Sequence, residues 1–263
     1  MRFILDKITP PAERPRVARE GLLNVLHSSL KACTSTIING RTGTGKTLLA
    51  ADFAHRSGRR VAWYKVDASD SDLSIFFHYL IESVRRQRLN FGHETLARLV
   101  EERVAVEDTP LLAEAFVYEL LESGDSPLLI VIDDLHLVYD APWVVPFFRR
   151  LLPLLPADAH MLITGRGLPP APLWRMRSKQ TLCVIEESNL AFSVEETKRL
   201  LLSYGLSDVM ASVAIEQTHG RAAALDAIAQ LMSASDQALA ESLTMAKARA
   251  RARRVRHAHG YSY

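Results

Sequence analysis

The sequence is poor in cysteine and lacks any long apolar run. Its 263 residues contain only two cysteines, Cys33 and Cys183, which provide neither a disulfide framework nor the spacing of a metal site. A reducing, cytoplasmic setting is therefore expected. The apolar run before Asp6 is too short for a signal peptide, and no later run approaches the roughly 20 residues of a membrane span. We expect no membrane segment.

No internal repeat of solenoid period is visible, which argues against a solenoid. A strong net charge is also absent. The net charge is +2, and subtracting the six basic residues of the last 17 leaves about −4 for residues 1–246. Residues 247–256 are basic all round a helix, which predicts a solvated or disordered end rather than a buried stripe. Non-specific attraction to nucleic acid is the alternative for this stretch. DNA binding by this chain alone is not expected.

What the sequence does contain is an alternation of strands and helices. The composition, 48% apolar and 24% charged, is that of an ordinary globular protein. Fully apolar strands between helices indicate a parallel sheet that is covered on both faces. The expected strands span residues 33–39, 60–67, 126–134, 159–166 and 180–187. The expected helices span residues 19–30, 46–58, 71–87 and 142–155, the last one broken by prolines.

Strand signals stop after Glu187, and helical signals replace them. Ser193 and Glu196 have the spacing of a capping box, and helices are expected over residues 194–205, 208–220 and 221–232. His219 and Gly220 mark a helix end. We therefore expect an α/β nucleotide-binding domain over residues 1–190. A small helical lid is expected over 191–246, and a basic tail, disordered or a solvated helix, over 247–263.

The strongest motif lies between the first strand and the helix that follows it. Residues 40–47 match G-x-x-x-x-G-K-[ST] in full, so a phosphate-binding loop is favoured over a simple glycine-rich turn. Lys46 would reach the β- and γ-phosphates, and the Thr47 hydroxyl would ligate Mg²⁺. The expected cofactors are ATP or ADP with Mg²⁺. The predicted nucleotide-binding residues are Gly40, Arg41, Thr42, Gly43, Thr44, Gly45, Lys46, Thr47 and Leu48.

Polar residues at the ends of two later strands complete the predicted site. Asp133 would hold Mg²⁺, and Asp134 would orient or deprotonate the attacking water, unless the pair is an ordinary acidic turn. Thr164 and Arg166 end another strand, where a γ-phosphate sensor is expected because the carboxyl ends of neighbouring strands converge. A solvent-facing arginine is the alternative for Arg166. The predicted catalytic residues are Asp134, Lys46 and Arg166.

Several other polar residues leave two interpretations open. Asp67 and Asp70 follow the second strand and are either catalytic or turn formers and a helix N-cap. Arg175 and Arg177 either contact nucleotide or form a solvated edge, which we favour. His136 is expected to be a surface residue.

These motifs, in this order, resemble the STAND class of signal-transduction ATPases. The similarity is greatest to the nucleotide-binding module of the maltose-regulon activator group, the large ATP-binding LuxR-type regulators. It rests on these stretches: DKITPP, VARE, NGRTGTGKTLL, VAWYKVDASDSDLSIFFHYLIESV, LLIVIDDLHLV, LITGRGLPPAPLWRMRSK and LAFSVEETKRLL. The resemblance implies a switch that is closed with ADP, and that opens and self-associates with ATP and an inducer. It also places Arg19 near the adenine and matches Arg166 to the arginine of a sensor strand.

The sequence also departs from that family. Its members are usually much longer, with a helical-repeat sensor and a DNA-binding output domain, and no such segment fits after Met232. The Gly-Pro dipeptide that many relatives use near adenine is replaced by His219, Gly220 and Arg221. The chain is therefore expected to be an excised module or a natural short form.

We expect an ATP-binding, slowly hydrolysing switch module of the transcriptional-regulator type. The main alternative is an AAA-like or loader ATPase that acts on a protein or nucleic-acid partner, with Arg175 or Arg177 as an arginine finger. A bare nucleotide-binding interaction protein is a further alternative. A small-molecule kinase ranks last, because the helices after Ser193 carry few arginines.

Overall fold

The computed structural model describes residues 3–93, 95–101, 105–179 and 181–235. The chain divides into two compact units, residues 1–191 and residues 192–263. The predicted basic tail, residues 247–263, lies outside the described residues. None of the described helices is both long and apolar enough to cross a bilayer.

The first unit is built on a five-stranded sheet. Its strands are β1 (Ser35–Asn39), β2 (Arg60–Lys65), β3 (Leu128–Asp133), β4 (Ala159–Gly165) and β5 (Leu182–Ile185). All pair in parallel, in the order β2-β3-β4-β1-β5. β4 therefore lies between β1 and β3, so the carboxyl end of β4 separates the two strands that carry the phosphate-loop and acidic motifs.

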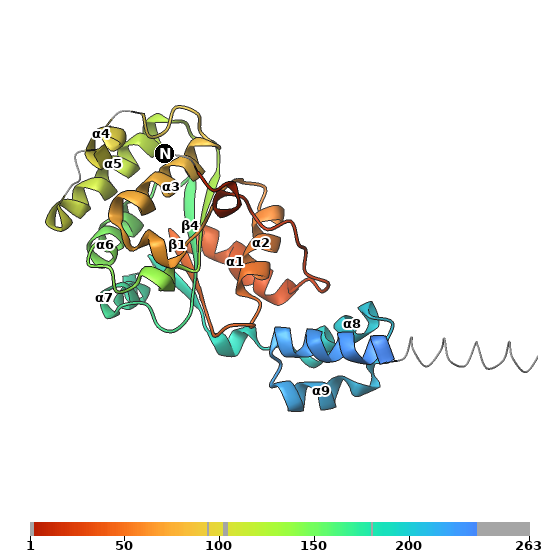
Figure 1. Ribbon diagram of the computed structural model, residues 1–263. Coiled ribbons are helices and arrows are strands. Elements are labelled where there is room, and N and C mark those ends of the chain that lie inside the picture. The colour runs from red at the N-terminus through yellow and green to blue at the C-terminus, as the bar shows by residue number, and fades with distance from the viewer. Residues whose placement is uncertain (1–2, 94, 102–104, 180, 236–263) are drawn as a thin grey trace, which may run out of the picture. The chain divides into compact units, whose positions relative to one another are not determined.

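Helices cover both faces of this sheet, as Figure 1 shows. One face packs against α1 (Glu20–Ala32) and α2 (Lys46–Arg56). The other packs against α3 (Leu73–Arg85), α5 (Thr109–Glu122) and α6 (Val144–Leu154). Consecutive strand residues point to opposite faces, so Ile37 and Ile38 enter different cores. The predicted P-loop NTPase sandwich of three layers is confirmed.

Some elements of this unit differ from the sequence-based prediction. α6 is continuous from Val144 to Leu154 although Pro153 lies inside it, so the predicted break at the prolines is wrong. A proline so near the C-terminus removes only one backbone hydrogen bond of the helix. α5 and the short α4 (Thr95–Glu101) lie where the sequence pattern carried no prediction.

Short helical turns connect the main elements of the unit. They are η1 (Leu5–Ile8), η2 (Ala68–Ser71), η3 (Val106–Asp108), η4 (Leu135–Val138), α7 (Ala171–Trp174), η5 (Arg175–Lys179) and η6 (Glu187–Leu190). Two of them, η4 and η6, follow the carboxyl ends of β3 and β5 and so border the predicted site.

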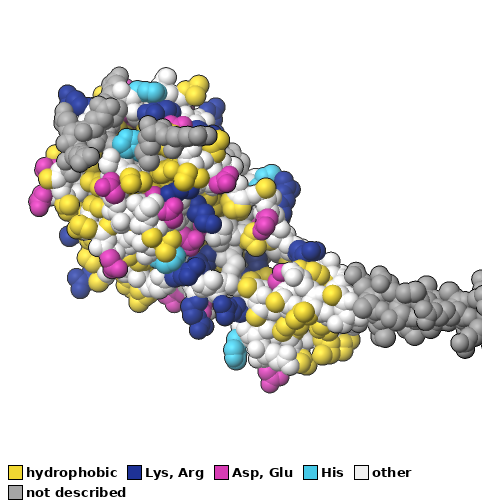
Figure 2. Space-filling model, viewed as in Figure 1, with side chains coloured by type: hydrophobic (Ala, Val, Ile, Leu, Met, Phe, Trp, Pro, Cys, Tyr) yellow, Lys and Arg dark blue, Asp and Glu magenta, His cyan; other side chains and the backbone are white. Residues whose placement is uncertain are grey.

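The second unit is helical. It contains α8 (Val194–Ser203), η7 (Asp208–Met210), α9 (Ala211–Thr218) and a further helix over residues 222–235. The predicted capping box is confirmed, because Ser193 and Glu196 each accept the other's backbone N–H. α9 ends at Thr218, and His219, its C-cap, adopts a left-handed conformation. Apolar side chains remain exposed on this unit (Figure 2), among them Leu202, Val209 and Leu231.

Candidate nucleotide-binding site

The predicted phosphate loop connects β1 to α2, and its backbone conformation depends on glycine. Gly43 and Gly45 have φ angles of 79° and 87°, in the left-handed region that other residues rarely adopt. A Cβ atom at Gly40 would lie 3.0 Å from the Leu190 side chain. The first backbone N–H groups of α2 have no partner within the helix, and the helix dipole adds positive potential there. The loop can therefore receive an anion.

Lys46 is buried at the start of α2. Its Nζ donates to the carbonyl oxygen of Arg41 over 2.9 Å, so the ammonium group folds back onto its own loop. Burial lowers the pKa of Lys46, the charge of Asp134 opposes that shift, and the charge of Arg166 adds to it. Asp134 and Arg166 therefore both lie close enough to Lys46 to influence it electrostatically.

Asp133 is the centre of the site. It ends β3 fully buried, and its carboxylate accepts the hydroxyl of Thr47 at 2.9 Å and the hydroxyl of Thr164 at 2.6 Å. Burial raises the pKa of Asp133, and the hydrogen bond from Thr164 opposes that increase. The position of β4 explains the arrangement, since its last residues stand between the phosphate loop and the acidic pair.

Asp134 adopts an unusual backbone conformation directly after β3. Its φ angle is 61°, and its N–H donates to the Thr164 hydroxyl over 2.9 Å. A non-glycine residue in this region indicates a local constraint, which here includes the bond to Thr164. His136 approaches Asp134, with 3.7 Å between Nδ1 and Oδ1. Only 12% of the His136 side chain is exposed, so the expectation of a surface residue is wrong, and burial lowers its pKa.

The structure adds one residue that the sequence motifs did not identify. Glu187, at the start of η6, accepts the backbone N–H of Arg41 at 2.8 Å and its Nε at 2.6 Å. The backbone hydrogen bond from Arg41 is the main reason that the pKa of Glu187 is lowered. β5 pairs with β1, and this places Glu187 beside the loop although 146 residues separate it from Arg41. No local pattern could have shown that contact.

The other predicted residues fall into two groups. Thr42 and Leu48 lie on the loop and the first turn of α2, and Arg166 is exposed just beyond β4. The buried guanidinium of Arg19 donates to the carbonyls of Leu190 and Ala191, at 2.8 and 2.9 Å. Its predicted role beside adenine stays a prediction.

Asp67 and Asp70 are structural rather than part of the loop. They form the capping box of η2, and both accept the ammonium group of Lys7. Arg177 pairs with Glu186 and lies over the ring of Trp174, at 4.7 Å from its centre, in agreement with the predicted solvated edge.

Comparison with known families agrees with this geometry. The AAA ATPase domain family matches residues 16–164, more than half of the chain. The chain belongs to that family. The matched region of this AAA ATPase domain runs from just before α1 to Thr164, and so contains the phosphate loop, the acidic pair and the hydroxyl that links them.

Solved structures with low sequence identity are also similar to this AAA ATPase domain. A Walker-type ATPase of Pyrococcus abyssi is 14% identical, with 93% of this chain and 79% of that chain covered and a TM-score of 0.49. RuvB of Thermotoga maritima, a single-residue variant, is 15% identical, with 82% and 64% covered and a TM-score of 0.43. A structure from work on katanin self-assembly is 16% identical, with 72% of this chain and 56% of that chain covered and a TM-score of 0.38.

The residues of this AAA ATPase domain fit a magnesium nucleotide. A hydroxyl and a carboxylate within 2.9 Å of each other are oxygen ligands of the kind that Mg²⁺ accepts. The described residues contain no group of three or more histidine, cysteine or acidic side chains that could hold a metal. Mg²⁺ is usually bound through one or two protein oxygens and keeps several waters and phosphate oxygens as its other ligands.

Proposed function

We propose that this AAA ATPase domain binds ATP with Mg²⁺, hydrolyses it slowly and serves as a nucleotide-operated switch of the transcriptional-regulator type. The observation that carries the proposal is the hydroxyl–carboxylate–hydroxyl arrangement of Thr47, Asp133 and Thr164 beside the buried Lys46. It joins the phosphate loop, the acidic strand and the sensor strand through side chains at one edge of the sheet.

Each residue has a distinct role in this proposal. Lys46 leaves the Arg41 carbonyl and neutralises charge on the β- and γ-phosphates. The Thr47 hydroxyl and the Asp133 carboxylate would hold Mg²⁺. Bound Mg²⁺ would neutralise phosphate charge. Asp134 orients the attacking water, and the exposed Arg166 stabilises the γ-phosphate.

The resemblance to STAND regulators supports the switch role, because such proteins hold ADP at rest and self-associate with ATP. A working AAA-like ATPase with a protein or nucleic-acid partner is the second candidate. The match to the AAA ATPase domain family is compatible with both candidates. The two differ in turnover. A switch keeps ADP bound and turns over slowly, whereas a working ATPase turns over rapidly when its partner is present.

The test is to purify the chain, identify any co-purifying nucleotide, and measure ATP turnover and molecular mass with ADP and with ATP. The switch predicts retained ADP, slow turnover and a higher mass with ATP. Rapid, partner-stimulated turnover would instead support the working ATPase.

Both candidate functions require ATP binding at the phosphate loop, and replacing the loop lysine tests that requirement by itself. Lys46→Ala is expected to weaken ATP binding by roughly 10- to 100-fold, because a charge-assisted contact to phosphate is lost. Lys31→Ala, at an exposed position in the last turn of α1, is the matched control. Equal ATP affinity in Lys46→Ala and the control, measured by calorimetry, would refute the phosphate-loop assignment.

A further inference from the structure

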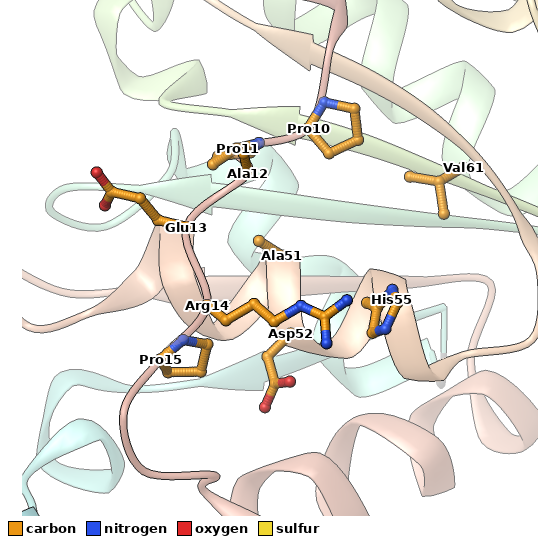
Figure 3. Close-up of a pocket in the computed structure, with 10 residues that line it drawn as sticks. All are labelled: Pro10, Pro11, Ala12, Glu13, Arg14, Pro15, Ala51, Asp52, His55 and Val61. Atoms are coloured by element: carbon orange, nitrogen blue, oxygen red, sulfur yellow. The ribbon is translucent and has the colours of Figure 1, made fainter. Parts of the chain in front are cut away.

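A cavity lies away from the phosphate loop, between the N-terminal segment and the second half of α2. Its volume is about 320 Å³. Figure 3 shows the segment Pro10–Pro15 passing over α2, with Ala51, Asp52 and His55 on the helix below and Val61 of β2 at one side. Asp52 lies six residues after Lys46, about 9 Å further along the helix. The cavity therefore lies apart from the phosphate-binding end of α2.

One wall of this cavity contains a carboxylate oxygen without a partner. Asp52 Oδ1 accepts Arg56 Nε at 2.8 Å, whereas the buried Oδ2 accepts no hydrogen bond from the described residues. Only 8% of the Asp52 side chain is exposed. A buried carboxylate oxygen that lacks a donor costs free energy, and a ligand N–H group would recover it.

The opposite wall is unable to supply the missing donor from its proline nitrogens. This wall contains three residues without a backbone N–H, Pro10, Pro11 and Pro15. They offer only carbonyl oxygens as acceptors, together with their apolar rings. Ala51 and Val61 extend the apolar surface. The cavity thus combines an acceptor for a protonated nitrogen with space for an aliphatic group.

A positive group at the cavity provides the complementary charge. Arg14 lines the cavity, and its side chain extends along α2 toward His55 (Figure 3). Its guanidinium group makes no hydrogen bond or ion pair with the part of the chain that the structure describes. A guanidinium group is well suited to bind a carboxylate with two parallel hydrogen bonds.

We propose that this cavity binds a small zwitterion of the amino-acid class. The ligand's ammonium group donates to Asp52 Oδ2, its carboxylate pairs with Arg14, and its aliphatic side chain packs on Pro10, Pro11 and Val61. A cavity of about 320 Å³ accommodates a ligand of this size. This site neither uses nor requires the nucleotide function proposed above.

The experiment titrates the full chain with L-leucine by calorimetry, with N-acetyl-L-leucine and L-leucinamide as matched probes. Acetylation removes the ammonium group, and amidation removes the carboxylate. We expect L-leucine to bind with a Kd of about 1 mM or tighter, and each modified probe to bind at least about tenfold more weakly.

Matched variants locate the binding. Asp52→Asn keeps the shape of the side chain and an acceptor for Arg56, but removes the charge; it should weaken L-leucine binding at least about tenfold. Glu20→Gln changes another acidic residue near Arg56, 3.6 Å away and outside the cavity lining, and should have no effect. Val61→Phe, which fills the cavity, should abolish binding and provides a second test if Asp52→Asn melts early.

Three results would overturn the proposal. The first is an absence of saturable binding of L-leucine by the wild-type chain at about ten times the expected Kd. The second is equal binding by wild type, Asp52→Asn and Val61→Phe. The third is equal binding of L-leucine and L-leucinamide, which would indicate a cation site without a carboxylate partner.

Discussion

At the scale of single residues, Thr164 connects the two acidic residues of the site. Its hydroxyl donates to Asp133 and accepts the N–H of Asp134. Loss of this hydroxyl oxygen would leave the buried Asp133 carboxylate with one donor fewer. It would also remove the acceptor for the N–H of Asp134, whose backbone is in the left-handed region. Thr164 therefore both orients Asp133 and maintains the conformation of Asp134.

Thr164→Val is expected to lower the free energy of unfolding by about 1–3 kcal/mol, because the substitution removes one of the two hydroxyl donors to the buried Asp133 carboxylate and leaves the Asp134 N–H without its acceptor. It should also weaken Mg²⁺-dependent ATP binding. Urea unfolding and calorimetry with and without Mg²⁺ measure the two effects. Thr164→Ser retains the hydroxyl and is the control. A valine variant as stable as the serine variant would contradict the assigned role.

His160 gives the unit a defined response to acid. It is buried in β4 and its Nε2 lies 3.0 Å from the Thr36 hydroxyl. Burial, together with the charge of Arg59, lowers the pKa of His160 to about 4. An unfolded histidine has a pKa of about 6.5, so the unfolded chain binds the proton first as pH falls. Stability is complete above pH 6.5 and decreases between about pH 6.5 and 4.

Over that range, His160 should account for a loss of about 3 kcal/mol in unfolding free energy, since each pKa unit corresponds to about 1.4 kcal/mol. The measurement is urea unfolding at pH 7.5, 6, 5 and 4.5. His160→Gln does not titrate and should reduce the pH dependence. His93→Gln, at an exposed position, should retain it. Identical pH profiles for these two variants would exclude His160 as the source.

At the scale of elements, an ion cluster fixes η1 against the turn after β2. The buried Lys7 donates to Asp70 at 2.5 and 2.7 Å and to Asp67 at 2.9 Å. Burial acts to lower the pKa of Lys7, but the hydrogen bonds to Asp70 and Asp67 outweigh it, so the pKa is raised. The ammonium group also lies 4.4 Å from the ring centre of Tyr79.

Lys7→Met should therefore destabilise the unit by about 3–5 kcal/mol, because Asp70 would remain buried as an uncompensated charge. Adding Asp70→Asn should restore at least about 1 kcal/mol, since the charge is then removed. Thermal and urea unfolding of the two single variants and the double variant give the coupling. Lys198→Met, which breaks only the exposed pair with Glu195, should change stability by less than about 0.5 kcal/mol. Strict additivity in the cycle would contradict the cluster.

The main elements of the sheet could be predicted because each has a strong local pattern. The apolar run Leu128–Ile132 is long enough, and its acidic end clear enough, to assign both a strand and a site. α5 was missed although Pro110 stands in its first turn, since its apolar residues spread round the helix. The contact of Glu187 with Arg41 depends on the pairing of β5 with β1, and the ion pair of Lys7 with Asp70 also joins distant parts of the chain. No pattern within a short stretch of sequence can predict such contacts.

At the scale of the whole molecule, the two units have separate cores. The core residues of the first unit lie on the two faces of the sheet, whereas Leu201, Leu206, Ala211 and Ala229 form a cluster of their own. Arg19 binds the last two carbonyls of the first unit, at Leu190 and Ala191. A cut after Ala191 therefore preserves the contacts of Arg19 with these carbonyls and removes no core residue from either face of the sheet.

Residues 1–191 expressed alone are expected to fold cooperatively and to bind Mg²⁺–ATP, because the loop, Asp133 and Thr164 are all retained. If the helical unit serves as the lid that the sequence predicts, the fragment should release ADP at least about tenfold faster than the full chain, since a lid slows dissociation rather than association. Stopped-flow release of a fluorescent ADP analogue measures this rate, and circular dichroism confirms folding. A shorter fragment of residues 19–191 lacks η1 and should be less stable through the loss of Lys7. Equal ADP release from a folded 1–191 fragment and the full chain would contradict the lid role while leaving the nucleotide site intact.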